Sequence, residues 1–264
     1  MALVLAVVNQ KGGVGKTTTA VNLAASLAAR EHRSLLVDLD PQGNATSGVG
    51  IARDQGERTT VYHALLGAAD ARSAILPTEV PNLFVLPSST DLVGAELELV
   101  SMEERESRLR DALDALRDDY DYLLIDCPPS LGLLTINALV AADRVLVPLQ
   151  CEYYALEGLG SLLRTIDLVK RSLKPGLGME GVVLTMFDAR NNLARQVMND
   201  VRTNLPGQVY ETVIPRNVRL SEAPSHGRPA ILYDIESKGA QSYLQLAEEL
   251  LQRHRAAALQ LKHA

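Results

Sequence analysis

A glycine-rich loop follows the first apolar run of this chain and restricts the folds open to it. Residues 3–8 are apolar, and residues 10–18 then read Gln-Lys-Gly-Gly-Val-Gly-Lys-Thr-Thr. Glycines at these places let successive backbone N–H groups converge on phosphate oxygens, and a helix that starts behind them adds a partial positive charge. Residues 16–30 contain no glycine or proline, and their apolar residues recur at helical spacing. A strand, this loop and a helix, in this order, predict a phosphate-binding loop and therefore a nucleotide.

Within the loop, two lysines and a threonine are the chemically active side chains. Lys16 stands where such a loop places the lysine that reaches the β- and γ-phosphates, and the Thr17 hydroxyl can ligate Mg²⁺. Lys11 is a second lysine five residues earlier, which suggests a nucleotide shared between two chains. The usual pattern has glycine at position 10, where this chain has Gln10. We expect the phosphates to contact Lys11, Gly12, Gly13, Val14, Gly15, Lys16, Thr17 and Thr18.

Length and composition limit the class of protein. The 264 residues suffice for one large α/β domain or two small ones, and no linker or repeat is visible, so a single domain over residues 1–264 is expected. Aromatic residues make up 4% and tryptophan is absent, which argues against an aromatic platform for single-stranded nucleic acid. The net charge of −6 disfavours a uniformly basic surface. Residues 164–228 nevertheless carry ten Lys or Arg against six Asp or Glu, so a local basic surface is expected.

The sequence shows no feature of export or membrane insertion. The N-terminus enters a strand at once without a basic leader, and Cys127 and Cys151 lie too far apart to suggest a disulfide framework. The longest uncharged stretch, residues 127–142, contains two prolines and several polar residues, so we interpret it as a loop and a buried helix. A cytoplasmic protein with reduced thiols is expected.

Strand-like and helix-like segments alternate along the whole chain. Several strand candidates are almost wholly apolar, as strands buried on both faces of a parallel sheet are. Ser101 followed by Glu104 resembles a capping box that would start one of the helices. The alternation predicts an α/β fold, with a doubly wound, mostly parallel sheet and helices on both faces. The predicted strands are 3–8, 34–39, 83–86, 122–125, 144–149, 181–186 and 208–214, and the predicted helices are 16–30, 92–100, 102–118, 132–142, 155–173, 191–204 and 238–262.

Acidic residues close two of the predicted strands, at the edge of the sheet where ligands bind. Asp126 ends a predicted central strand, which is the Walker B arrangement, and we expect it to hold Mg²⁺ opposite Thr17. Asp38 and Asp40 end the second strand, and only one of them is expected to face the phosphates. We expect Asp40 to position or deprotonate the attacking water, and Asp38 to orient loop backbone or the Mg²⁺ shell. The expected catalytic residues are Lys11, Lys16 and Asp40, and the expected metal ligands are Thr17, Asp40 and Asp126.

With these motifs placed, the chain resembles the ParA-type partition ATPases, close to the Soj branch of that family. The block at 11–18 alone marks the deviant Walker A class of P-loop NTPases, which also contains MinD-like proteins and the nitrogenase iron protein, and Gln10 fits that class. The blocks Asp-Leu-Asp-Pro-Gln-Gly-Asn at 38–44 and Asp-Cys-Pro-Pro-Ser at 126–130 extend the resemblance. Two later blocks are much more specific to ParA: Glu-Tyr-Tyr-Ala-Leu-Glu-Gly at 152–158 and Ile-Pro-Arg-Asn-Val-Arg-Leu-Ser-Glu-Ala-Pro-Ser at 214–225.

The resemblance implies a cycle driven by ATP and Mg²⁺. ATP binding would produce a sandwich homodimer in which Lys11 of each chain reaches the other chain's phosphates, much as an arginine finger does. The dimer would bind double-stranded DNA without sequence specificity, as a nucleoid-associated protein of the cytoplasm. A ParB-type partner would stimulate an otherwise weak hydrolysis of ATP to ADP and phosphate, and the released monomer would leave the DNA. The family's nucleoside contacts map to Pro215 and Asn217.

DNA contact would fall on arginines of the basic segment. Arg195 and Arg202 are seven residues apart and could share one helix face, and the resemblance favours Arg190 and Arg219. Phosphate contacts of this kind predict strongly salt-dependent binding. Each of these arginines could equally form a surface ion pair. The candidates are Arg190, Arg195, Arg202, Arg216, Arg219 and Arg228.

Three other functions stay open on the sequence. A MinD-like membrane ATPase would end in a basic amphipathic helix, but the apolar positions of 244–251 look sufficient to pack a helix on the sheet and the basic content behind them is thin. An iron–sulfur ATPase needs two suitable cysteines per chain, and Cys127 alone lies near the nucleotide segments. A switch that binds without hydrolysing is the third alternative, and Asp40 and Asp126 argue against it.

Overall fold

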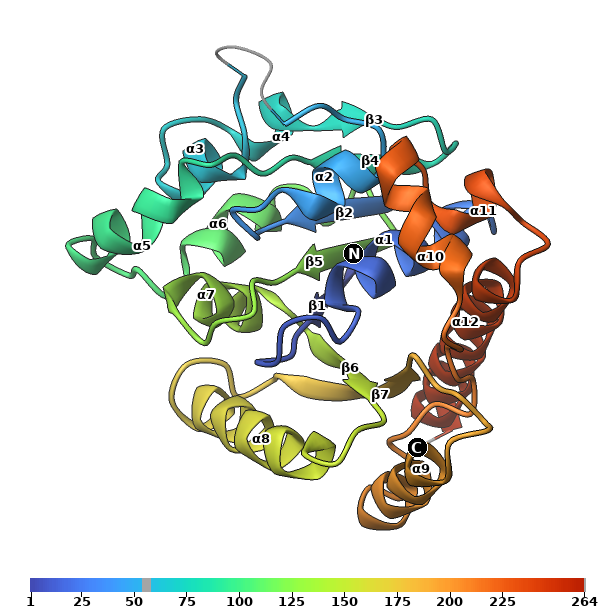
Figure 1. The fold of residues 1–264 in the computed structure, drawn as a ribbon. Coiled ribbons are helices and arrows are strands. Elements are labelled where there is room, and N and C mark those ends of the chain that lie inside the picture. The colour runs from blue at the N-terminus through green and yellow to red at the C-terminus, as the bar shows by residue number, and fades with distance from the viewer. Residues whose placement is uncertain (54–57, 264) are drawn as a thin grey trace.

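The computed structural model describes residues 1–53 and 58–263 and contains a seven-stranded sheet in the order β3-β4-β2-β5-β1-β6-β7 (Figure 1). Neighbouring strands run parallel, except that β3 pairs antiparallel with β4. The predicted doubly wound, mostly parallel α/β fold is therefore confirmed. The strands are β1 (Leu3–Val7), β2 (Ser34–Asp38), β3 (Leu76–Pro77), β4 (Leu83–Leu86), β5 (Tyr122–Asp126), β6 (Arg144–Gln150) and β7 (Gly178–Thr185).

Helices cover both faces of the sheet. Residues of α1 and α12 belong to the hydrophobic core on one face, and residues of α6, α7 and α8 belong to the core on the other face (Figure 1). The helices are α1 (Lys16–Ala28), α2 (Asn44–Gly48), α3 (Val61–Leu65), α4 (Ala71–Ala74), α5 (Leu92–Val100), α6 (Arg108–Asp114), α7 (Leu133–Ala141), α8 (Ala155–Ser172), α9 (Asn192–Asn204), α10 (Val218–Glu222), the 3₁₀ turn η1 (Ala223–His226), α11 (Ala230–Tyr233) and α12 (Lys238–His263).

Each central strand divides its side chains between the two cores. On β5, Leu123 and Ile125 join the core beneath α6, α7 and α8, while Leu124 joins the core beneath α1 and α12. All three side chains are fully buried, and burial of one such side chain is worth about 1.5–3 kcal/mol. Because both faces of the strand are buried, the sequence must be apolar at every position, which explains the uninterrupted apolar runs.

The C-terminal helix α12 packs on the sheet through its apolar side. Leu246, Ala247 and Leu250 are fully buried, and Tyr243 donates or accepts a hydrogen bond at 3.1 Å from the Thr19 hydroxyl of α1. The expectation that these apolar positions would pack a helix on the sheet is confirmed. In the part of the chain that the structure describes, no helix combines the length and the hydropathy that a membrane span requires.

The predicted strand at 208–214 is wrong. Val209 makes a single isolated bridge to Val182, and the pairing then stops before Ile214, whose N–H donates to the Leu184 carbonyl at 2.8 Å. The physical reason lies in α12: both carboxylate oxygens of Glu249 accept backbone N–H groups, from Glu211 and Thr212, at 2.9 Å. A side chain from a distant helix therefore satisfies the amides that a neighbouring strand would otherwise have paired.

The predicted helix at 102–118 begins six residues late, and the predicted capping box is wrong. Ser101 ends α5 instead, and its hydroxyl donates to the Glu98 carbonyl at 3.0 Å. Glu104 takes a positive φ of 50°, which a helix cannot accommodate. α6 starts at Arg108, where the Asn137 side chain of α7 accepts the Leu109 N–H at 3.1 Å. The cap thus comes from another helix.

The short elements α2, α3, α4, α10, α11, η1 and β3 were not predicted. Each has five residues or fewer. Such lengths span little more than one helical turn, so the apolar period cannot show.

A buried carboxylate ties α12 to the edge strand β7. Glu180 accepts the Tyr210 hydroxyl at 2.7 Å and bonds His254 Nε2 of α12 at 3.0 Å, with an Arg144 guanidinium nitrogen 3.6 Å away. Burial alone would raise the pKa of Glu180, but the hydrogen bond and charge of His254, with the Tyr210 bond, lower it below its usual range. The folded state therefore favours the carboxylate form.

Glu180→Gln should destabilise the protein by about 1–3 kcal/mol at pH 7, because a charged hydrogen-bond network is broken in the core. The lowered pKa makes this contribution complete above about pH 4.5, the usual carboxyl value, and it should fade as the pH falls through the folded-state pKa. Urea unfolding at pH 7 and at pH 4 measures the difference between parent and variant. Glu236→Gln, at an exposed glutamate, is the control. A difference that grows on acidification would contradict the assignment.

Candidate nucleotide site

The glycine-rich loop leaves β1 between its two neighbours β5 and β6, at the carboxyl edge of the sheet. Gly13 and Gly15 take positive φ values of 75° and 88°, which a residue with a Cβ adopts only under strain. Gly15 caps α1, and its carbonyl accepts the Thr19 N–H at 2.8 Å. The first amides of α1 are thereby turned toward the loop, as a phosphate site requires.

Two adjoining cavities lie beside this loop. One of about 450 Å³, here called the phosphate-side cavity, is lined by the loop glycines, Lys16, Thr17 and Asp40. A second of about 250 Å³, here called the nucleoside-side cavity, is lined by Pro215, Asn217 and residues of α10. The two cavities share Gly15, Thr18 and Met186. The structure thus brings the residues predicted for the phosphates next to those predicted for the nucleoside.

Lys16 forms the positive floor of the larger cavity. Its side chain is buried, and Nζ donates to the Lys11 carbonyl at 3.2 Å. Burial lowers the pKa of Lys16, while the carboxylates of Asp126 and Asp40 oppose that shift. An ammonium held between the loop and two carboxylates is suited to a polyanion that enters from the cavity.

Asp126 is the most unusual side chain of the site. It is fully buried at the end of β5, and neither of its carboxylate oxygens accepts a hydrogen bond of good geometry from the described residues. Burial, followed by the charge of Asp38, raises its pKa well above the usual value, and the neighbouring Thr17 hydroxyl offsets part of this rise. A buried carboxylate without donors is costly, and a cation removes that cost.

The oxygen atoms around Asp126 fit a Mg²⁺ site that is completed by waters and by the phosphates of the substrate. Within residues 1–53 and 58–263, no three His, Cys, Asp or Glu side chains converge as a closed metal cage. Mg²⁺ sites commonly use one or two carboxylates, waters and the phosphates of the substrate. Asp126 and the Thr17 hydroxyl therefore offer the protein's share of such a shell.

Asp38 and Asp40 have separate roles in the loop that follows β2. Asp38 is directly opposite Asp126 in the strand register, and its Oδ2 accepts both the N–H and the hydroxyl of Thr46 at 2.7 Å. Burial raises the pKa of Asp38, while the Thr46 bonds lower it. Asp40 lines the phosphate-side cavity, and its backbone carbonyl accepts the Ser88 hydroxyl at 2.6 Å. Asp38 therefore holds the loop, as expected, and Asp40 faces the cavity.

Lys11 lies outside the phosphate-side cavity. Its ammonium forms an ion pair with Glu152, just beyond the end of β6, and both side chains are about half exposed. The backbone at Lys11 is fixed by Asn9, whose side chain accepts its N–H at 3.0 Å and bonds the Pro148 carbonyl at 2.7 Å. Glu152 stands in the sequence block 152–158, but nothing in that block predicts this ion pair. A partner 141 residues away leaves no local signal.

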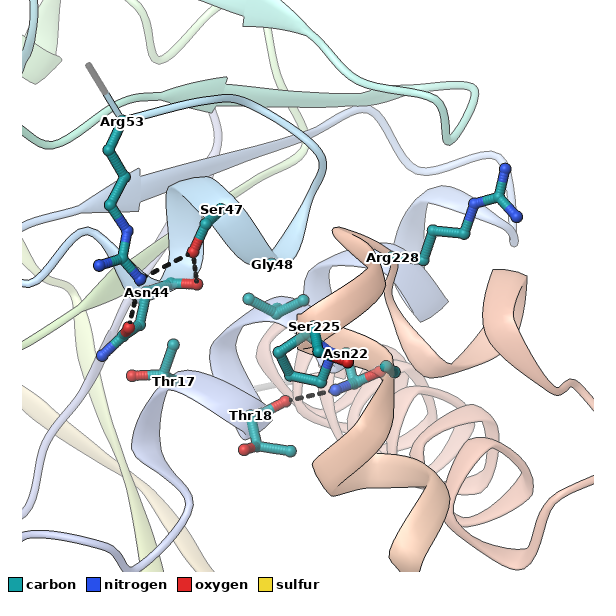
Figure 2. A pocket seen from close by; sticks show the side chains of 12 residues that line it. Thr17, Thr18, Asn22, Asn44, Ser47, Gly48, Arg53, Ser225 and Arg228 are labelled. Carbon is teal, nitrogen blue, oxygen red and sulfur yellow. Dashed lines mark hydrogen bonds between the residues drawn. The ribbon is translucent and has the colours of Figure 1, made fainter.

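A third cavity, of about 400 Å³, opens on the other side of Thr17 and Thr18, between α1, α2 and η1 (Figure 2). Asn22 and Thr18 both line it from α1, where the Asn22 side chain donates to the Thr18 carbonyl at 2.8 Å. Arg53, which sequence reasoning missed, bonds the Asn44 and Ser47 side chains at 2.7 and 3.0 Å, and so clasps α2. Helix α2, which begins four residues after Asp40, is therefore held by a side chain from beyond its own C-terminal end.

The candidate DNA arginines are dispersed. In Figure 1, α9, which carries Arg195 and Arg202, lies apart from α10, with α12 between them in the view. Four of the six form ion pairs with carboxylates: Arg190 with Asp188 at 2.8 Å, Arg202 with Glu211 at 3.1 Å, Arg219 with Glu222 at 2.8 Å and Asp234 at 3.1 Å, and Arg228 with Glu79 at 3.0 Å. Arg195 bonds Asn192, and Arg216 lines the nucleoside-side cavity. In one chain they do not form a single patch.

The two cysteines are both buried free thiols. Burial raises the pKa of Cys127 well above its usual value and that of Cys151 to about 11. Neither thiol is presented as a thiolate at the surface, which an iron–sulfur cluster shared between two chains would require.

Comparisons with known proteins place this arrangement among nucleotide-dependent proteins. The family model of an AAA domain matches residues 2–179. The chain is 61% identical to the chromosome partitioning protein ParA of Myxococcus xanthus, over 95% of this chain and 88% of that protein. It is 58% identical to the sporulation initiation inhibitor protein Soj of Bacillus subtilis, over 95% and 98%. A crystal structure titled cobyrinic acid a,c-diamide synthase from Mycobacterium smegmatis, with a bound ATP analogue and magnesium, is 40% identical over 97% of both chains, with a TM-score of 0.86.

Proposed function

Because this chain belongs to the ParA/Soj family of partitioning ATPases, we propose that it is an ATP-dependent DNA segregation ATPase. In this proposal, ATP joins two chains into a dimer, the dimer binds double-stranded DNA without sequence specificity, and a ParB-type partner stimulates hydrolysis and release. The observation that carries it is the convergence of Lys16 and Asp40 on one cavity beside the loop, with the buried carboxylate of Asp126 close enough to Lys16 to affect its pKa.

ATP and Mg²⁺ are the ligands that the site supports. Thr17 and Asp126 would hold the metal, which neutralises charge on the phosphates when bound. The loop amides and Lys16 would bind the phosphates, and Pro215 and Asn217 would contact the nucleoside in the adjoining cavity. The bound ATP analogue and magnesium in the Mycobacterium smegmatis structure support this assignment.

Asp40 is the residue that we assign to the attacking water. Its carboxylate lines the phosphate-side cavity, and Oδ1 accepts the Gln42 N–H at 2.9 Å, which fixes its orientation. A carboxylate held in this way can orient a water and take its proton as the phosphorus–oxygen bond forms. Hydrolysis then yields ADP and phosphate, slowly unless a partner acts.

Lys11 would serve the partner chain in the dimer. In the single chain its ammonium is paired with Glu152, so this ion pair must break before Lys11 can reach across to another chain's phosphates. An exposed ion pair is weak, about 0.2–1 kcal/mol, and therefore easily exchanged for phosphate contacts. The pair would keep Lys11 extended while the chain is alone.

Glu152→Gln is therefore expected to tighten the ATP-dependent dimer. Two such pairs per dimer correspond to a gain of about 2- to 30-fold in the dimer association constant. Sedimentation velocity with a non-hydrolysable ATP analogue measures it, and Glu157→Gln, at an exposed glutamate of α8, is the matched control. A weaker dimer would show that Glu152 contacts the partner chain instead.

The experiment that tests the proposed function is DNA retention with ATP, with ADP and without nucleotide, over a salt series. Binding should require ATP and should fall with salt, with a slope of about −0.9 per phosphate contacted. Equal retention in all three states would overturn the proposal. Flotation with anionic liposomes distinguishes the membrane alternative, which the burial of Leu246, Ala247 and Leu250 in the core disfavours. The corresponding location would be the cytoplasm, at the nucleoid.

A further inference from the structure

Helix α5 carries an apolar ridge that faces solvent. Val93, Leu97 and Val100 are 70%, 79% and 57% exposed. Their spacing of four and three residues places them on one side of the helix, while Leu92, Ala95 and Leu99 fill the core on the other side. Single exposed apolar residues are ordinary, but three in a row on one helix face mark an interaction surface. Figure 1 shows α5 at the outer margin of the fold, away from α12.

The surroundings of this ridge are acidic. The connection from β4 to α6, residues 87–107, holds six acidic residues and one basic residue, a net charge of −5 in a chain whose total is −6. The one basic residue, Arg105, is engaged with Glu106 at 2.9 Å and with the Val100 carbonyl at 3.1 Å. The acidic residues are Asp91, Glu96, Glu98, Glu103, Glu104 and Glu106.

The negative charge around the ridge limits which kind of molecule can bind there. DNA and anionic lipid are repelled by a negative rim, and a second copy of this chain would bring the same rim against itself. An apolar ridge within an acidic rim complements a polypeptide segment with an apolar face and Lys or Arg beside it. The surface therefore fits a basic amphipathic segment of another protein.

The inner side of α5 contacts the loop that follows Asp126. Glu96 Oε1 accepts the Leu134 N–H at 3.4 Å, at the start of α7. The same carboxylate lies over Gly132, where a Cβ would be only 1.9 Å from Oε1, so no side chain fits beneath it. Residues 127–132 join this contact to Asp126, and Pro129 among them lines the phosphate-side cavity. A shift of α5 therefore reaches the hydrolytic site through one short loop.

We propose that the ridge of Val93, Leu97 and Val100 is the docking surface for a basic amphipathic segment of the ParB-type partner. In this proposal, Glu96 transmits the movement of α5 on docking to residues 127–132, the loop that follows Asp126. The identity of the partner rests on the proposed function, whereas the surface and the contact rest on the geometry of α5. Glu96 acts here as a positioning residue, because it touches the backbone of the loop and not the nucleotide.

Leu97→Ser tests the docking surface. ATP turnover is measured with the DNA-bound protein against increasing amounts of the full-length cognate ParB-type protein. The half-saturating partner concentration should rise at least about tenfold, since one well-exposed leucine of the ridge is lost, while turnover without partner and ATP-dependent dimer formation stay unchanged. Leu168→Ser, at a 65% exposed leucine of α8, is the matched control and should leave the curve unaltered.

Glu96→Ala tests the transmission step. The half-saturating partner concentration should stay as in the parent, but the maximal stimulation should fall several-fold, and Glu96→Gln, which keeps an acceptor for the Leu134 N–H, should restore most of it. A Leu97→Ser curve equal to the parent curve, or a loss of dimer formation in that variant, would overturn the docking surface. A parent protein that the partner fails to stimulate would instead overturn the proposed function, and with it the partner named here.

Discussion

Asp40→Ala is expected to lower ATP turnover by about 10²- to 10⁴-fold while the ATP-dependent dimer stays on DNA. The size follows from the proposed role, because the variant loses the group that orients the attacking water and takes its proton. The fold should be preserved, since the Asp40 side chain accepts only the nearby Gln42 N–H among the described residues, and the loop is held independently by Asp38 and Ser88. Binding of the phosphates by Lys16 and the loop amides is not touched.

The measurement pairs phosphate release with DNA retention in the same sample. Asp40→Ala should show little release and prolonged retention with ATP, and dissociation with ADP. Asp40→Asn is the isosteric control: it keeps an acceptor for the Gln42 N–H but cannot take a proton, so it should behave like the alanine variant. Turnover at the parent rate in either variant would remove Asp40 from the mechanism.

The fold was largely predictable because its signals are local. β1, β2 and β5 are each visible in the sequence as an apolar run, and Gly13 and Gly15, which take positive φ values, follow β1 in the loop. The same locality placed Lys16, Asp40 and Asp126 at one edge, because parallel strands end at the same side of a sheet. The register of the folded chain then puts Asp38 directly opposite Asp126, which the sequence analysis did not predict.

The secondary-structure errors occur where a segment is hydrogen-bonded to a side chain far away in the sequence. The segment 208–214 has the composition of a strand, and Glu249 of α12 takes its amides. The helix expected from residue 102 starts at Arg108, where Asn137 of another helix accepts the Leu109 N–H. In both places local propensity was overruled by a hydrogen bond from a distant element.

Charges near the surface were the least predictable feature. Lys11 pairs with Glu152 and Arg228 with Glu79, across 141 and 149 residues. An excess of arginines in one segment predicts a basic surface only if the carboxylates of other segments lie elsewhere, but here Asp234 pairs with Arg219 and Glu79 pairs with Arg228. To bind DNA, each of these arginines would have to leave its carboxylate for a phosphate. Such an exchange is favoured in a dimer, because a dimer presents several of these arginines to the DNA at once.

Asp126→Asn is expected to change two properties in opposite directions. Without ligand, the variant should be more stable than the parent by about 1–3 kcal/mol, because it replaces a buried carboxylate that lacks donors and lies beside Asp38. Turnover should fall by at least about 100-fold, because the amide lacks the negative charge that holds the metal, and the metal is what stabilises the charge developing on the phosphates. Asp118→Asn, at an aspartate whose side chain is 88% exposed, should change neither property.

Thermal unfolding with and without Mg²⁺ and an ATP analogue separates the two effects. Ligand at about 1,000 times its dissociation constant stabilises a protein by about 4.1 kcal/mol, so the parent should gain that much while the variant gains much less. The order of stability should therefore reverse when the ligand is added. A variant that is less stable without ligand would mean that Asp126 has a donor in the folded chain, and equal ligand stabilisation would place the metal elsewhere. If the reversal is observed, burial of the Asp126 carboxylate destabilises the protein without ligand, and binding of Mg²⁺ with the nucleotide relieves that cost. The ligand-free monomer is then the least stable state of the cycle.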